Sequence, residues 1–153
     1  MKRFLQVLGG LFLGVLVVVG ALVGYAAHKG SKLDASSKSY VDQTLPVIAA
    51  KWSKDELLKR ASPELLQQIN ANPDQTDLLF GKFSQLGELK SYDGSKGDSF
   101  VLVNPMKGKI ITANYLARAT FEHGDAQISI RLIQHDDQWQ YLNFFVNSPQ
   151  FLK

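Results

Sequence analysis

The second half of the chain alternates between apolar and polar side chains, with the period of two that predicts β-strands. The alternation is clearest in residues 109–122 (KIITANYLARATFE) and 126–134 (AQISIRLIQ), and the aromatic-rich residues 138–146 (QWQYLNFFV) follow them. Residues 88–104 hold one long strand or two short strands around the turn-rich DGSKGD. Together these segments predict an antiparallel sheet of about four strands.

The residues before these strands have helical spacing and helix-capping signals. Ser53 and Glu56 have the spacing of a capping box, and Ser62 followed by Pro63 repeats the signal. Residues 72–87 predict a further helix that stops at glycine. Residues 39–52 also look helical, and Pro46 is expected to kink or divide that helix. Helices followed by an antiparallel meander predict a soluble α+β domain over residues 39–153, after a polar linker over residues 28–38.

The alternation also predicts a register for one hairpin. A two-residue turn at Gly124-Asp125 sets apolar residues opposite one another on one face: Phe121 with Ile128, Ala119 with Ile130, and Ala117 with Leu132. The other face then has Arg118 directly opposite Arg131. Like charges so placed destabilise a sheet. The pair is therefore a solvated face, a contact for a carboxylate, a phosphate or an acidic partner, or a sign that the register is different.

The start of the chain has a different character, because no charged residue occurs from Phe4 to Ala27. A helix of about 20 such residues can cross a bilayer. This predicts a single-pass anchor over residues 4–27, with residues 1–3 as a cytoplasmic tail because Lys2 and Arg3 adjoin the membrane. A cleaved signal peptide is the alternative. The layout predicts an inner-membrane protein whose soluble domain lies in the periplasm.

Small residues share one side of the predicted anchor helix. At about 100° per residue, a narrow stripe contains Gly10, Gly14, Val17, Ala21 and Gly24. In lipid, such residues let two helix backbones approach closely, so the stripe predicts packing against another copy or against a different membrane protein. The alternative is that glycine and alanine are simply common in membrane helices.

Composition and motifs narrow the chemistry of the soluble part. Lys2 and Arg3 supply two charges of the net +3, and from residue 28 onward 15 Lys and Arg face 14 Asp and Glu. Nucleic-acid binding is therefore not expected. The three histidines lack metal-ligand spacing and the chain has no cysteine, so neither a metal nor a cofactor is expected.

A small-ligand pocket is the remaining candidate on the apolar face. Ala113, Ala117 and Ala119 alternate there, and they leave room either for a closely packed helix or for a cavity. Such a cavity would be lined by Tyr115, Tyr141 and Asn143. A buried asparagine needs hydrogen-bond partners. No acid falls on this face, which disfavours an acid–base enzyme.

Two segments carry a resemblance to a known superfamily. The join FSQLGEL (residues 83–89) leads into a long alternating strand, and DDQWQYLNFFV (residues 136–146) closes the set. Over residues 39–148 the chain resembles the nuclear-transport-factor-2-like (cystatin-like) superfamily, and most of all its small membrane-anchored bacterial envelope domains. The resemblance implies helices packed on a curved, cone-shaped sheet. Because relatives include isomerases, dehydratases and secretion-system subunits, the fold does not decide the function.

These observations favour a non-catalytic, membrane-anchored accessory, scaffold or assembly subunit of a membrane protein complex. The first alternative is a periplasmic domain that binds a small ligand. The second is an isomerase-like enzyme.

Overall fold

The computed structural model describes residues 26–28 and 31–152. The predicted tail, residues 4–25 of the predicted anchor, and the stripe of Gly10, Gly14, Val17, Ala21 and Gly24 lie outside the described residues. Ala26 and Ala27, the last two residues of the predicted anchor, belong to strand β1 (Ala26–His28). Within the described ranges, no helix combines the length and the apolar character that a membrane crossing requires.

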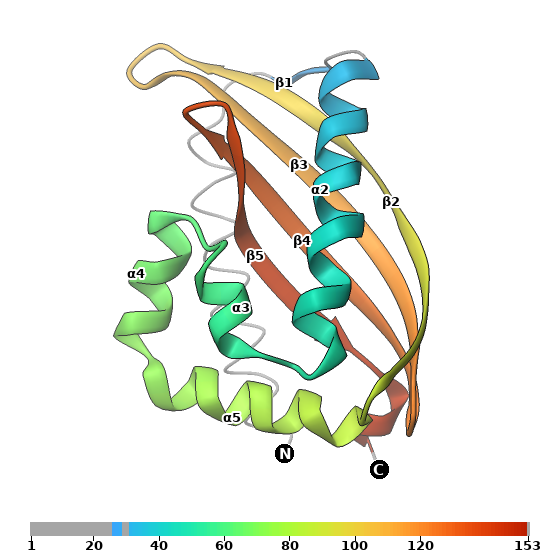
Figure 1. Cartoon of the computed structure of the whole chain (residues 1–153). Helices are drawn as coiled ribbons and strands as arrows, with labels where there is room; N and C mark the ends of the chain where they lie inside the picture. Colours follow the sequence, from blue (N-terminus) through green and yellow to red (C-terminus); the bar gives the residue numbers. More distant parts are fainter. Residues whose placement is uncertain (1–25, 29–30, 153) are drawn as a thin grey trace.

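The α+β class is confirmed, because the helices come before the long strands along the chain (Figure 1). The helices are α2 (Ser31–Ala50), α3 (Lys54–Leu58), α4 (Pro63–Ala71) and α5 (Pro73–Phe83), and the 3-10 turn η1 (Ser84–Leu86) follows them. The long strands are β2 (Leu89–Asn104), β3 (Gly108–Phe121), β4 (Gly124–His135) and β5 (Gln138–Asn147), and η2 (Pro149–Leu152) comes last.

Helix α2 is longer than the sequence suggests. It starts at Ser31, so residues 31–38 of the predicted linker are helical, and it continues through Pro46 to Ala50 without being divided. Contacts to the sheet explain the early start. The Asp34 carboxylate accepts a hydrogen bond of 2.8 Å from the backbone N–H of Ser99 on β2. Tertiary contacts thus override the weak helix propensity of this serine-rich segment.

The predicted helix caps are confirmed. The hydroxyl of Ser53 accepts a hydrogen bond from the N–H of Glu56, and the hydroxyl of Ser62 accepts one from Leu65. Helix α2 ends in a Schellman turn, in which the N–H of Ser53 donates to the carbonyl of Ile48. The left-handed position of this turn, usually glycine, is occupied by Trp52 with φ 48°. Its indole is 5% exposed, so burial of the ring offsets the backbone strain.

The described strands form one antiparallel sheet in the order β1-β2-β3-β4-β5. The three-residue β1, paired with β2, is an addition to the four predicted strands. Figure 1 shows a strongly twisted sheet with α2 across one face and α3, α4 and α5 grouped on the same side. We call this covered face the inner face and the opposite one the outer face. The main core lies between the inner face and the helices, and it includes Leu45, Phe83, Ala117, Ile128 and Phe144.

The predicted register of the β3–β4 hairpin is wrong by four residues. Phe121 pairs with Gly124, so the turn residues are Glu122 and His123 instead of Gly124 and Asp125. The turn is held from outside the hairpin, because Glu122 and His123 donate their backbone N–H groups to the carbonyls of Glu88 and Leu86. The predicted face of each residue in this hairpin is nevertheless correct, since a slip by an even number of residues preserves the alternation.

The four-residue slip separates the two arginines. Arg118 is opposite Gln127, and Arg131 is opposite Asn114. Both arginines lie on the outer face, as predicted, but the expected like-charge pair does not form.

The predicted position of Asn143 on the apolar face is also wrong. A bulge in β5 between the pairs Leu132–Tyr141 and Arg131–Asn143 inserts Leu142 as an extra residue. Before the bulge Tyr141 faces inward, and after it Phe144 faces inward opposite Ile130. Asn143 therefore lies on the outer face beside Arg131. The bulge explains why both alternations along this strand look apolar in the sequence.

Candidate functional site

Helix α2 occupies the space in which the sequence predicts a pocket. The Tyr115 hydroxyl is 2.6 Å from the Ser37 hydroxyl, and it also donates to the Asp34 carbonyl at 3.0 Å. The Tyr141 hydroxyl is 2.7 Å from that of Thr44. Both tyrosines are buried, at 4% and 0% exposure. The alanines of β3 thus make room for a helix, which is one of the two alternatives above, and these tyrosine hydroxyls hold it to the sheet.

Carboxylates of α2 add further hydrogen bonds to this contact between α2 and the sheet, which we call the polar seam. Asp42 accepts hydrogen bonds from Tyr92 at 2.7 Å and from Ser95 at 2.8 Å, both on β2, and forms an ion pair with Lys38. Burial alone would raise the pKa of Asp42, but the hydrogen bonds from Lys38, Tyr92 and Ser95 outweigh it and lower the pKa. Burial raises the pKa of Tyr141, so its hydroxyl stays protonated at neutral pH. The seam suits a structural tie better than a general base, which needs a raised pKa.

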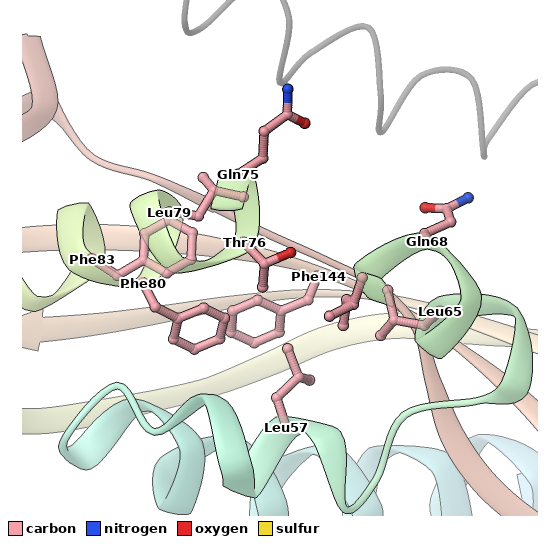
Figure 2. A pocket seen from close by; sticks show the side chains of 10 residues that line it. Leu57, Leu65, Gln68, Gln75, Thr76, Leu79, Phe80, Phe83 and Phe144 are labelled. Carbon is pink, nitrogen blue, oxygen red and sulfur yellow. The ribbon is translucent and has the colours of Figure 1, made fainter. Parts of the chain in front are cut away.

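A small apolar cavity lies between α3, α4, α5 and β5 (Figure 2). Phe80 and Phe144 are stacked beside it, with ring centroids 6.5 Å apart, and Leu57 and Leu65 line it from α3 and α4. Its volume is about 40 Å³, far below the several hundred Å³ of a typical ligand pocket.

Arg118 lies in a cleft near the β3–β4 turn. The cleft is open, has a volume of about 420 Å³, and is also lined by Asp93, Asp125, Gln127 and Asn147. Two carboxylates line the same cleft as this one guanidinium, so the cleft has no excess positive charge. This cleft is therefore poorly suited to the anion that the sequence suggests for Arg118.

Arg131 lies in a different environment, in the middle of the outer face. It is half-buried, and its Nε donates a hydrogen bond of 2.8 Å to Oδ1 of Asn114. Within the described part of the chain, its two Nη atoms have no hydrogen-bond or ion-pair partner. Burial lowers the pKa of Arg131 from its ordinary value. The group nevertheless stays charged, because a guanidinium is not deprotonated in proteins.

Asn114, Arg131 and Asn143 form one row across β3, β4 and β5. Such cross-strand neighbours have Cβ atoms about 5 Å apart. Asn143 is buried, and its Oδ1 accepts the backbone N–H of Phe144 at 2.8 Å. Asn114 was missed in the sequence because only the true register places it opposite Arg131. Tyr115 and Tyr141, predicted to share a pocket with Asn143, lie on the other face.

Over residues 26–28 and 31–152, no group of three or more His, Cys, Asp and Glu could hold a metal ion. His135 instead faces Glu64 of α4, with Nε2 and Oε1 3.2 Å apart. Comparison with known proteins adds no further guide, since no protein family, curated protein or solved structure matches this chain.

Proposed function

We propose that this protein is a non-catalytic, membrane-anchored accessory or assembly subunit of a membrane protein complex. The observation that supports it is the closed inner face, where α2 fills the room left by Ala113, Ala117 and Ala119. A domain built around an internal ligand or substrate would leave that face open. The uncharged residues 4–25, which precede strand β1, and their small-residue stripe supply the proposed anchor and its contact with a partner.

Within this proposal, the domain has the helix-on-sheet form of the nuclear-transport-factor-2-like superfamily, with the cone of that fold filled by its own first helix. The domain lies in the periplasm, and the anchor lies in the inner membrane.

Co-purification from native membranes in a mild detergent tests the proposal. The full chain is expected to bring down a stoichiometric membrane protein, and Gly10→Leu/Gly14→Leu/Gly24→Leu is expected to lose it because leucine keeps the helix backbones apart. Gly9→Leu is the control, since residue 9 lies about 100° around the helix from Gly10, which is at the centre of the stripe. Recovery of a lone monomer, or equal losses in the two variants, would count against the proposal.

The cleft beside Arg118 supports a second candidate, a periplasmic domain that binds a small polar ligand. Its volume of about 420 Å³ falls within the usual range of ligand sites. Native mass spectrometry of the purified full chain distinguishes the two functions. A bound small molecule that is lost on Arg118→Gln supports ligand binding, and an unliganded chain with a protein partner supports the subunit.

A further inference from the structure

We propose that the row of Asn114, Arg131 and Asn143 on the outer face is the site at which this protein binds an acidic side chain of a partner protein. The inference rests on the proposed function for the source of the carboxylate, which is a protein. The geometry of the row itself supplies the chemistry.

Each asparagine oxygen of the row already accepts one hydrogen bond, so the unpaired groups of the row are mainly donors. Asn114 Oδ1 is occupied by Arg131, and Asn143 Oδ1 is occupied by the N–H of Phe144. These bonds orient both amides, so what remains is the two NH₂ groups of the asparagines and the Nη atoms of the arginine. A ligand for this row must accept hydrogen bonds.

Within the described part of the chain, the positive charge of the row is not compensated. Among the residues described, no carboxylate pairs with Arg131. The nearest acid along the row is the exposed Asp98, opposite Asn114 on β2. It lies two strand spacings from Arg131, which is about 10 Å. The cleft of Arg118, with Asp93 and Asp125, provides the contrasting case on the same face.

Buried apolar side chains border the row and partly shield its guanidinium from water. Leu142 and Ile133 beside the row are 1% and 8% exposed, and Leu116 at its border is 40% exposed. A guanidinium in such surroundings is less screened by water, so a bidentate carboxylate binds it more strongly. The bulge at Leu142 is the device that turns Asn143 into the row.

Titration of the full chain in detergent with sodium butyrate tests the site directly. The chain has four arginines (Arg3, Arg60, Arg118 and Arg131), so the Nε–H spectrum after ¹⁵N-arginine labelling is simple to assign by substitution. The Arg131 signal is expected to shift saturably, with a dissociation constant on the order of 1–10 mM. Butyramide, which is neutral, should leave it unchanged.

Variants separate the site from a general charge effect. Arg131→Gln should abolish the saturable response, and Arg131→Lys, which keeps the charge but lacks the fork, should weaken binding about tenfold. Arg118→Gln is the matched control on the same face and should bind butyrate as the wild type does. Three results would overturn the proposal: an equal shift of the Arg118 signal, a saturable response in Arg131→Gln, or an Arg131 shift that is still unsaturated at roughly 100 mM butyrate.

A second titration identifies the source of the carboxylate. Acetyl-Leu-Asp-Leu-amide should bind more tightly than butyrate, and acetyl-Leu-Asn-Leu-amide should not bind. Tighter binding of inorganic phosphate than of either carboxylate would overturn the assignment to an acidic protein surface. The butyrate titration needs no partner protein. Its failure is therefore distinguishable from failure of the co-purification that tests the subunit role.

Discussion

The contact between Tyr141 and Thr44 gives a direct test of whether α2 is tied to the sheet by hydroxyl groups. Tyr141 is 0% exposed, and its hydroxyl is 2.7 Å from that of Thr44. Tyr141→Phe removes this bond and keeps the ring, which packs against Tyr40 and Phe144. A typical intramolecular hydrogen bond contributes about 1 kcal/mol. The free energy of unfolding should therefore fall by about 1 kcal/mol.

A double-mutant cycle isolates this bond from other effects of the substitutions. Thr44→Val removes the partner hydroxyl, and it also frees the Tyr40 carbonyl that this hydroxyl contacts at 2.7 Å. Urea unfolding of the wild type, Tyr141→Phe, Thr44→Val and the double variant gives the coupling free energy. The expected coupling is about 1 kcal/mol.

Two results would refute the hydroxyl tie. One is a coupling near zero, and the other is a Tyr141→Phe variant as stable as the wild type. Either would mean that the hydroxyl faces water or a ligand site in solution, as the pocket interpretation of Tyr141 requires. Loss of more than about 3 kcal/mol would indicate instead that the ring packing had changed, because that is the scale of cavity formation.

Three further predictions follow from particular conformations and charges. Trp52→Gly relieves the strain of a left-handed backbone but deletes a buried ring, so the free energy of unfolding, measured with urea, should fall by about 3 kcal/mol. A variant more stable than the wild type would contradict the conclusion that burial of the ring offsets the strain. Asp136 and Asp137 have φ 53° and 63°, as a type I′ turn requires, and such positive angles strain both aspartates. Asp136→Asn/Asp137→Gly should therefore raise the free energy of unfolding by about 1 kcal/mol, which thermal unfolding can measure. A lower melting temperature in the variant would argue against backbone strain at this turn. The pKa of Asp42 is lowered, so the stability that its carboxylate contributes is complete above the ordinary pKa of 3.8 and is lost as the pH falls below that value. In urea unfolding, Asp42→Asn should be less stable than the wild type at pH 7 and should show a flatter dependence of stability on pH below 4. Parallel profiles of the two proteins would exclude the ionised carboxylate as a tie.

Local signals in the sequence were sufficient for α3, α4 and α5. Ser53 and Ser62 cap α3 and α4 as predicted, and α5 with its short 3-10 extension stops at Gly87, which has φ 80°. These features depend on a few neighbouring residues, so one sequence can reveal them. The start of α2 could not be predicted in the same way. It depends on the contact of Asp34 with Ser99, which is 65 residues away along the chain.

The strands show how far alternation reaches. Alternation identified the face of each residue in β3 and β4, because apolar side chains on one face are the condition for burying that face. It could not distinguish registers that differ by two or four residues, since all of them pair apolar with apolar. The true register is set by backbone bonds from Glu122 and His123 to residues 86–88, and a turn rule contains no information on these. The bulge at Leu142 is equally invisible to a strict period of two.

The four-residue slip also bears on the candidate site, because it changes what each arginine meets. In the predicted register the two guanidinium groups would be direct neighbours, and a carboxylate between them would be held by both. In the observed register Arg131 is opposite Asn114, four residues from Arg118 along β3, or about 13 Å. Each arginine thus faces an amide across the sheet, which removes the repulsion. Of these two arginines, only Arg131 keeps an uncompensated charge beside apolar side chains among the described residues, so the proposed binding of an acidic partner would depend on Arg131, and Arg118 is its internal control.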